Sequence, residues 1–558
     1  MTVPSGSSPE KDTQTAPQRP SSARTGVSRL RARAAKRAQL SAEARSERAV
    51  VETAQQEQAR PSGPLGFLAH LNLKPLWFLA AFAAFGLVFL IPVDPAAEGG
   101  LTAPGRTALA ILAFAVVMWI TEAVSYSVSA VMIIGLTALF LGFGPGIEDP
   151  TEPMGTSAAL GQALGGFSSS AVALVAAALA LAAAMQATGL HKRLALLVLR
   201  FAGEKTSNIV IGAIVISIIL AFFVPSATAR AGAVVPILLG MVAAFGLSVN
   251  SRLGALLIIT AAQAVSIWNV GIKTAAAQNL VAVGFIESEM GIDIPWGQWF
   301  LWAAPWSVVM SVALFFIMRW AIRPETERIE GGRAAVTAQL AELGPVTAKE
   351  KRLIAVAVVL LLAWATEGVL HPVDSSTITL VAIGFMLLPR VGVFSWKTVE
   401  SLVNWGTLIV FAVGISLGSL LLSTGAAAWL SNLVFGSLGL SSMPLLATIA
   451  LMSVFTILIH LGFASATALA SALIPVFIAF AATLPGAADG GFGFVVIQQF
   501  VISFGFLLPI SAPQNMLAYG TGAFTAKQFL KTGIPLTVLG YLLVLLFSAT
   551  YWKWVGLV

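Results

Sequence analysis

The hexapeptide Pro-Ser-Ala-Thr-Ala-Arg at 225–230 recurs 239 residues later as Ala-Ser-Ala-Thr-Ala-Leu at 464–469. In both copies a proline, Pro236 or Pro475, follows the serine by ten residues. Three further pairs recur in the same order at offsets of 236–245 residues: Trp-x-Thr-Glu at 119–122 and 364–367, Thr-Gly at 188–189 and 424–425, and Gln-Asn at 278–279 and 514–515. A single short motif is weak evidence, but four ordered pairs at nearly constant spacing predict an internal duplication.

The composition around these motifs is that of a membrane protein. Of the 558 residues, 57% are hydrophobic and only 10% are charged, and the mean hydropathy is +0.88. Soluble domains carry about 25% charged residues, so this chain lacks the charge to cover a water-facing surface. Its apolar runs are about 20 residues long, which is the length of a transmembrane helix. We therefore expect an all-α polytopic membrane protein.

The repeats and the charges divide the chain into four parts. We predict a basic, disordered cytoplasmic tail over 1–70, a first transmembrane helix plus repeat one over 71–321, a cytoplasmic linker over 322–351, and repeat two over 352–558. Residues 1–60 hold 11 Lys and Arg against 6 Asp and Glu. Basic segments beside apolar spans stay in the cytoplasm, which explains the positive charge without a nucleic-acid partner. The chain has no cysteine, so it has neither disulfides nor thiolate metal sites.

The Ser-Ala-Thr motifs are the strongest candidates for a binding site. Repeats with broken helices are typical of secondary transporters, whose substrate sites lie near the membrane midplane. Pro225 favours a break before the first motif, and freed backbone N–H groups and hydroxyls can bind an anion without a charged side chain. The alternative is that these small residues only allow close helix packing. The predicted substrate-binding residues of the motifs are Ser226, Ala227, Thr228, Ser465, Ala466 and Thr467.

Paired amides form the second candidate group. Gln278 and Asn279 in repeat one, and Gln514 and Asn515 in repeat two, lie inside apolar sequence. Buried amides need hydrogen-bonding partners. We predict that the substrate supplies them, and hydrogen bonds between helices are the alternative.

Three ionisable residues are also singled out. Arg230 and Lys273 lie in apolar stretches, where a charge is costly and indicates function, and we predict that both compensate the charge of the substrate. The alternative for both is snorkelling to the membrane interface. His460 is a candidate pathway residue, with a structural histidine as the alternative. Glu122 and Glu367, at matching places in the repeats, are expected to brace helices.

These motifs resemble the divalent anion:sodium symporter family, which carries dicarboxylates, citrate and sulfate. The resemblance covers roughly 70–558 and also rests on Pro-Ile-Ser-Ala-Pro-Gln-Asn at 509–515. It implies two inverted repeats with broken helices and re-entrant hairpins, and about 11 transmembrane helices. It further implies a homodimer in which a mobile domain moves like an elevator against a scaffold. The composition of the apolar stretches 167–187 and 406–424 fits full spans and re-entrant hairpins equally, and by this analogy they belong to the hairpins.

The chain departs from the family at one position in each motif. Sodium-coupled members carry Ser-Asn-Thr, in which the asparagine helps to bind substrate and sodium, whereas Ala227 and Ala466 occupy that position here. We therefore expect no cofactor, and we expect Arg230 and Lys273 to supply the positive charge instead. Moving uncompensated charge across a bilayer is costly, which favours exchange of one anion for another. Sodium-coupled symport of a dicarboxylate or sulfate is the alternative.

Other classes of function fit the sequence less well. A membrane-embedded enzyme needs clustered acidic residues or histidines, and the four histidines are scattered, so we expect no enzyme. Proton carriers need an acidic residue in the pathway, and the motif regions contain none. We predict a secondary active transporter of small divalent organic anions. Its partners are its anionic substrate and the lipid bilayer, and its location is a bacterial inner membrane.

Overall fold

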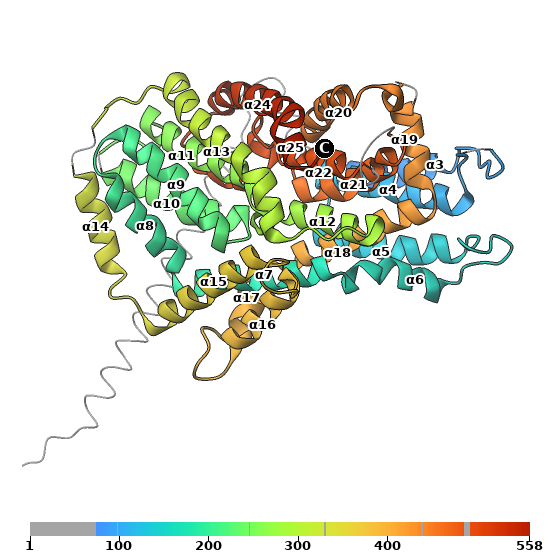
Figure 1. Cartoon of the computed structure of the whole chain (residues 1–558), viewed down its shortest axis with the longest axis horizontal. Coiled ribbons are helices and arrows are strands. Elements are labelled where there is room, and N and C mark those ends of the chain that lie inside the picture. The colour runs from blue at the N-terminus through green and yellow to red at the C-terminus, as the bar shows by residue number, and fades with distance from the viewer. Residues whose placement is uncertain (1–73, 98, 245, 329–330, 437–438, 485–490) are drawn as a thin grey trace, which may run out of the picture. The chain divides into compact units, whose positions relative to one another are not determined.

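All regular elements in the described part of the chain are helices, as expected for an all-α membrane protein (Figure 1). Seven of them are long and apolar enough to cross a membrane by length and composition, and seven shorter apolar helices accompany them. The predicted tail over 1–70 lies outside the described residues. The computed structural model describes residues 74–558 except for 98, 245, 329–330, 437–438 and 485–490.

The first half of the described chain is a series of helices joined by short loops and turns. Three single turns, η1 (Thr137–Leu141), η2 (Gly165–Ser168) and η3 (Lys273–Ala275), extend or join them. The helices are α3 (Lys74–Val88), α4 (Ala103–Thr121), α5 (Tyr126–Leu136), α6 (Thr156–Leu164), α7 (Ser170–Thr188), α8 (Leu190–Ala202), α9 (Thr206–Phe223), α10 (Ala227–Ala244), α11 (Arg252–Gly271), α12 (Ala277–Met290) and α13 (Trp296–Ala321).

A short helix in the linker, α14 (Gly332–Glu342), leads into the second half. Two single turns, η5 (Leu440–Ser442) and η7 (Pro509–Ser511), lie between helices of this half. The helices are α15 (Ala348–Thr366), α16 (Ser375–Leu387), α17 (Trp396–Leu402), α18 (Trp405–Ser423), α19 (Ala426–Val434), α20 (Leu445–His460), α21 (Ala466–Ala481), α22 (Phe492–Ile502), α23 (Pro513–Tyr519), α24 (Ala526–Ala549) and α25 (Tyr551–Trp554).

The two halves repeat each other element by element. Helices α10 and α21 both carry an internal proline at their tenth residue, Pro236 and Pro475. So do α13 and α24, with Pro305 and Pro535. The corresponding pairs of helices are α4 and α15, α5 and α16, α7 and α18, α8 and α19, α9 and α20, α10 and α21, α11 and α22, α12 and α23, and α13 and α24.

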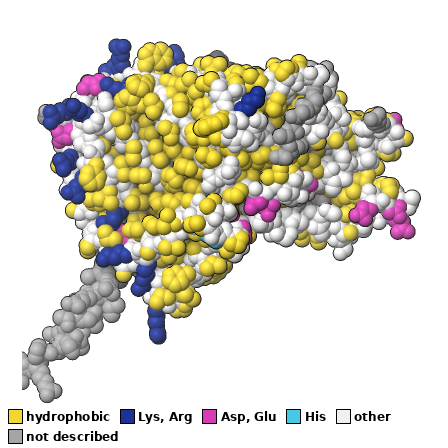
Figure 2. Space-filling model, in the orientation of Figure 1, with side chains coloured by type: hydrophobic (Ala, Val, Ile, Leu, Met, Phe, Trp, Pro, Cys, Tyr) yellow, Lys and Arg dark blue, Asp and Glu magenta, His cyan; other side chains and the backbone are white. Residues whose placement is uncertain are grey.

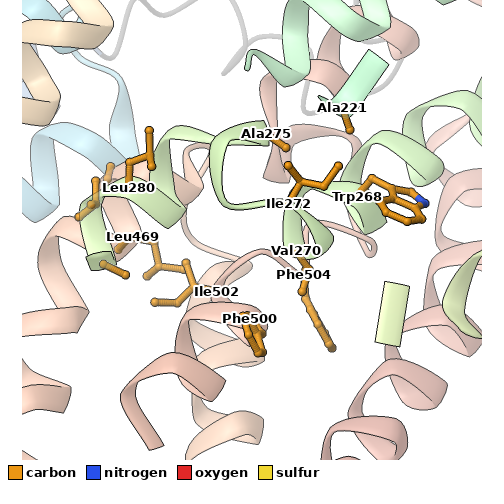
Figure 3. Close-up of a cluster of buried hydrophobic side chains, with 14 of the residues drawn as sticks. Ala221, Trp268, Val270, Ile272, Ala275, Leu280, Leu469, Phe500, Ile502 and Phe504 are labelled. Atoms are coloured by element: carbon orange, nitrogen blue, oxygen red, sulfur yellow. The ribbon is translucent and has the colours of Figure 1, made fainter. Parts of the chain in front are cut away.

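The helices that carry the repeated motifs pack around α11, which has the most buried surface of the spans. Ser251 caps α11 through the N–H of Gly254, and every residue from Leu253 to Gly271 is buried. Where α11 breaks into η3, apolar side chains of both halves meet, among them Val270, Phe500 and Phe504 (Figure 3). A helix that is apolar all round belongs in the centre of a membrane protein.

Contacts between helices define two groups, which we name by their content. The motif body consists of α9–α13 and α20–α25, in which α11 packs on α9, α10, α13 and α23, and α24 packs on α13 and α20. The frame consists of α3–α8 and α15–α19, in which α7 packs on α16 and α17, and α18 packs on α4 and α5. The two groups meet where α12 contacts α7 and α18, where α21 contacts α18 and α19, and where α8 packs on α9 and α10.

For 167–187 and 406–424 the full-span alternative is confirmed, and the assignment to re-entrant hairpins by family analogy is wrong. These stretches form α7 and α18, two continuous helices of 19 residues that are each long and apolar enough to span. The breaks occur instead at the Ser-Ala-Thr motifs, between α9 and α10 and between α20 and α21. Gly, Ser and Ala make α7 and α18 suitable for close contact with the motif body, and this packing role gave them a composition that resembles a hairpin.

Charged residues separate toward two ends of the described chain (Figure 2). The exposed basic residues on and near the linker define the basic face, and they include Arg323, Arg333 and Lys349. The acidic face includes the loop 142–155, with Glu148, Asp149 and Glu152, and the turns that follow α12 and α15. Helix α15 joins the two faces, because it begins beside Lys349 and ends at Glu367.

Candidate binding site between the repeats

A cavity of about 660 Å³ brings the two Ser-Ala-Thr motifs together. Motifs that are 239 residues apart in sequence share one wall, with polar side chains of both repeats around them. The frame contributes Ser127 from the start of α5 and Asn404 from the residue that precedes α18. The predicted site residues that line this cavity are Ser226, Ala227, Thr228, Gln278, His460, Ser465, Ala466, Thr467 and Gln514.

Each motif serine caps the helix that begins at the cavity. Ser226 Oγ accepts a hydrogen bond from the N–H of Ala229 at 3.2 Å, and Ser465 Oγ accepts one from the N–H of Ala468 at 3.2 Å. Both hydroxyls keep their proton free to donate. The N-terminal ends of α10 and α21 therefore present unpaired N–H groups and positive dipole ends to the cavity, which favours an anionic ligand.

The two glutamines cross between the repeats in a reciprocal way. Gln278 Nε2 of repeat one donates to Ser503 Oγ of repeat two at 3.3 Å. Gln514 Nε2 of repeat two donates to Ser266 Oγ of repeat one at 3.1 Å. The glutamines are 236 residues apart and the serines 237, so the site is built on an approximate two-fold relation between the repeats.

Asn279 and Asn515 lie behind the cavity wall and do not line it. Asn279 Nδ2 donates to the carbonyl oxygens of Asn269 at 2.6 Å and Ile272 at 3.1 Å. Asn515 Nδ2 donates to the carbonyl of Gly505 at 2.7 Å. Both amides thus bond carbonyls that the breaks in α11 and α22 leave unpaired, and they hold the breaks in shape.

Arg230 is buried beside the first motif, with no exposed surface. Its Nη2 donates to Asn269 Oδ1 and, at 3.0 Å, to the carbonyl oxygen of Ala275. Arg230 itself does not line the cavity. Its guanidinium lies behind Asn269, which does, and keeps the one N–H of Nε and the two of Nη1 without a partner among the described residues.

His460 holds the corresponding place in repeat two. Its Nε2 donates to the carbonyl oxygen of Ser511 at 3.2 Å, and Ser511 follows Ala275 by 236 residues. Arg230 comes from the helix after its motif, whereas His460 comes from the helix before its motif. At the position that corresponds to Arg230, repeat two has Leu469, which belongs to the buried apolar cluster (Figure 3).

Lys273 does not share this cavity. Its Nζ donates to the carbonyl oxygen of Ile294 at 2.5 Å, and the residue lines a second cavity of about 420 Å³. Four carboxylates line the second cavity: Glu287, Asp293, Glu367 and Asp374. The prediction that Arg230 and Lys273 act together on the substrate is therefore not supported by their placement, because Arg230 lies behind the first cavity and Lys273 lines the second.

Sequence reasoning missed several residues of the first cavity. Asn269, Ser503 and Gln186 line it, as do Tyr126 and Asn404 from the frame. Asn269 was detectable, because it is a lone amide in an apolar run ten residues before Asn279. The frame residues carry no comparable signal, since isolated Ser, Tyr and Asn near span ends are common at membrane interfaces.

Two repeats of broken helices around a cavity of neutral donors are typical of a secondary transporter. The chain belongs to the family described as the sodium:sulfate symporter transmembrane region, whose model matches residues 73–558. This confirms the resemblance to divalent anion symporters that the motifs indicate.

Individual relatives agree with this family. A membrane protein of Cupriavidus necator is 52% identical over 475 residues, which cover 85% of this chain and 92% of the relative. An L-tartrate/succinate antiporter of Escherichia coli is 28% identical over 492 residues, covering 86% of this chain and 98% of the antiporter. The inner membrane protein YbhI of Escherichia coli is 29% identical over 400 residues, 70% of this chain and 81% of YbhI.

One solved structure has the same fold. It is the YdaH transporter of Alcanivorax borkumensis, with a TM-score of 0.50 and 16% identity. The match covers 76% of this chain and 98% of that transporter. At this identity the similarity concerns the fold alone.

Proposed function

We propose that this protein exchanges small dicarboxylate anions across a bacterial inner membrane without sodium. The L-tartrate/succinate antiporters among its relatives support this choice of substrate. The observation that carries the exchange mechanism is the placement of Arg230, a buried guanidinium that lies behind the wall of the cavity. Sodium-coupled transport, which the family description names, is the competing mechanism.

The chemistry around Arg230 suits a cation. A carbonyl oxygen and an amide oxygen, those of Ala275 and Asn269, converge on its guanidinium. Oxygens of this kind are hard ligands that bind metal cations in other proteins. Here the fixed guanidinium of Arg230 takes the place of a metal cation, and His460 donates to the corresponding carbonyl in repeat two. With these positions filled by side chains, the substrate needs no bound sodium.

A built-in cation also favours exchange over one-way transport. When the cavity holds a dicarboxylate, its two negative charges are offset by Arg230 and by the positive ends of α10 and α21, each of which is equivalent to about half a charge. When the cavity is empty, the motif body carries a buried positive charge, and moving this charge through a low-dielectric membrane is costly. The loaded carrier therefore crosses more readily than the empty one in either direction, which is the condition for obligatory exchange.

Each Ser-Ala-Thr motif would bind one carboxylate of the substrate. Ser226 and Thr228 with the start of α10 offer one set of hydroxyl and N–H donors, and Ser465 and Thr467 with α21 offer the other. The approximate two-fold relation suits a substrate with two similar ends. The motif body would carry it past the frame in an elevator-like movement.

The test is uptake of labelled succinate, citrate and sulfate into proteoliposomes. Each anion is measured with a sodium gradient and, separately, with unlabelled anion inside. We expect succinate uptake that requires internal dicarboxylate and ignores sodium. Uptake driven by sodium into empty vesicles would contradict the proposal.

Two arginine variants distinguish an effect of Arg230 on the binding site from the effect of losing one positive charge anywhere in the protein. Arg230→Gln should reduce exchange at least tenfold, because a hydrogen bond to a charged group contributes about 1.5–3 kcal/mol. Arg319→Gln is the matched control, since Arg319 forms an exposed ion pair with Glu327 at 2.8 Å, and it should exchange normally. Equal activities of the two variants would remove the role assigned to Arg230.

The proposal includes the placement and assembly of the protein. The basic linker supports a cytoplasmic N-terminus and basic face, and inner membrane protein YbhI among the relatives supports the choice of membrane. We also propose that two copies form a homodimer, as the family resemblance implies. Native mass measurement in detergent would reveal a single copy if this last part is wrong.

A further inference from the structure

The start of α13 is capped by a carboxylate from another part of the chain. Pro295 precedes this helix and offers no side-chain cap. Glu367 supplies it instead, because its Oε2 accepts a hydrogen bond from the N–H of Trp296 at 3.0 Å. The same carboxylate accepts from Ser375 at the start of α16, from its N–H at 2.7 Å and its hydroxyl at 2.5 Å. Glu367 is only 6% exposed.

This contact joins the motif body to the frame at the acidic face. Trp296 begins α13 of the motif body, whereas Glu367 and Ser375 connect α15 and α16 of the frame. The indole of Trp296 also stacks on Trp364 of α15, with ring centroids 6.2 Å apart and an angle of 22° between the planes. The two groups of helices are therefore held together here by a buried carboxylate and a stacked ring pair.

A glycine makes this close approach feasible. A Cβ atom on Gly297 would lie 3.3 Å from the carbonyl oxygen of Ala365, which is tighter than nearly all real Cβ contacts. Any larger side chain at 297 would push α13 away from α15. Lys273 supports the same segment, because its amine bonds the carbonyl of Ile294, two residues before the capped N–H.

The matching glutamate of repeat one makes no such bridge. Glu122 accepts a hydrogen bond from the hydroxyl of Tyr126 at 2.8 Å, within the frame. The helix that corresponds to α13 is α24, and its cap residue Thr525 forms a capping box with Gln528. The bridge is thus present at the acidic face and absent at the basic face.

We propose that Glu367 is a releasable clamp that holds the carrier in the conformation described here, with Lys273 as a positioning residue for the capped segment. The proposal rests on the elevator-like movement of the proposed function. A motif body that moves past the frame must break the hydrogen bond from the Trp296 N–H to Glu367 and the stacking of Trp296 on Trp364 in every cycle. Breaking them exposes a charged carboxylate and an uncapped helix start, so Glu367 biases the carrier toward the clamped state.

The absence of cysteine from the chain allows a direct test in the full-length protein. The reporter is Ile294→Cys, at a position that is 1% exposed beside the clamp, and labelling with a charged maleimide is timed in nanodiscs. Glu367→Gln keeps the shape, but its amide cannot accept from both backbone N–H groups. We expect it to speed labelling about tenfold, the effect of losing one hydrogen bond to a charged group.

A second variant opens the clamp without changing its charge. Gly297→Val should speed labelling at 294 in the same way, because its side chain meets the Ala365 carbonyl. The matched controls are Glu122→Gln for the charge and Gly384→Ala for the glycine, since no atom lies within 4 Å of a Cβ at 384. Both controls should label at the original rate.

A third measurement separates movement of the body from local loosening. Ala277→Cys reports on the cavity. In sealed inside-out membrane vesicles that present only the basic face to an impermeant maleimide, its labelling should slow in Glu367→Gln as the carrier leaves the described conformation.

The proposal is overturned if labelling at 294 is unchanged in both Glu367→Gln and Gly297→Val. It is also overturned if labelling at 294 becomes faster but labelling at 277 does not become slower. The measurement needs no substrate. The labelling result therefore tests the clamp even if the protein does not exchange dicarboxylates. Conversely, normal exchange would not save the clamp if the labelling rates were unchanged.

Discussion

The proposed binding residues of the cavity are neutral hydrogen-bond donors. Because the two glutamines hold equivalent positions in the two repeats, their contribution to substrate binding can be tested twice in one molecule. Gln278→Leu and Gln514→Leu each remove an amide that lines the cavity and bonds a serine of the other repeat. We expect each to raise the KM for exchange about fivefold, because one hydrogen bond contributes about 1 kcal/mol. Initial rates of counterflow over a range of succinate concentrations check this. A large effect in one variant and none in the other would contradict the two-fold arrangement.

The alanines of the motifs give a second prediction for single residues. Restoring the family's asparagine with Ala227→Asn and Ala466→Asn together adds two amides to the cavity. Exchange should stay independent of sodium, because Arg230 and His460 still bond the carbonyls of Ala275 and Ser511. Uptake with and without sodium checks this, and the Arg230→Gln variant serves as the comparison. If the double asparagine variant took up substrate only with sodium while the unmodified protein did not need it, Arg230 and His460 would not be replacing a bound sodium ion.

Duplication is the reason that the motif residues of the cavity could be predicted from the sequence. Ser226, Gln278 and their counterparts stand out because each occurs twice at a constant offset. Arg230 and Lys273 occur once, so only their cost in an apolar stretch marked them. The energetic cost of burying a charge does not indicate which groups the buried side chain contacts. It gave the same prediction for Arg230 beside the cavity and for Lys273 among carboxylates.

At the scale of helices, a second carboxylate caps a helix that is remote in sequence. The Glu325 carboxylate accepts the N–H groups of Arg252 at 2.6 Å and Leu253 at 2.9 Å, at the start of α11. Burial alone would raise the pKa of Glu325, but these N–H bonds outweigh it and hold the pKa below its ordinary value. Its contribution to stability is therefore complete above the ordinary glutamate pKa and is lost as the pH falls through the lowered one.

This cap predicts the stability of α11. Glu325→Gln should destabilise the protein by about 0.5–2 kcal/mol, as for other lost caps, and its thermal unfolding should depend less on acid than that of the unmodified protein. Thermal unfolding in detergent from pH 7 to pH 3 measures both effects. Glu327→Gln is the control, because Glu327 is 68% exposed in its ion pair with Arg319. Equal acid sensitivity of both variants would argue against the cap.

The course of a helix was harder to predict than a binding residue when tertiary packing determined whether the helix was continuous. The break at Ser226 was predicted because Pro225 disfavours a continuous helix. The Gly, Ser and Ala content of the stretches 167–187 and 406–424, which end in Thr-Gly, fits both full spans and hairpins, and only the family resemblance assigned them to the hairpins. Composition does not distinguish a helix that other helices cover from a hairpin inside the protein. The capping of α13 by Glu367 is a tertiary contact that no local pattern indicates.

The whole molecule places its charges at opposite ends, and this predicts its orientation in the membrane. The loop 142–155 carries exposed Glu148, Asp149 and Glu152, whereas the linker carries exposed basic residues. Because basic segments stay in the cytoplasm, Glu148→Cys should react with an impermeant maleimide in intact cells. Ala334→Cys, in the linker helix, should react only after the membrane is opened. Both sites are exposed, and the chain has no other cysteine. The reverse pattern would invert the orientation and place the basic face on the outer side.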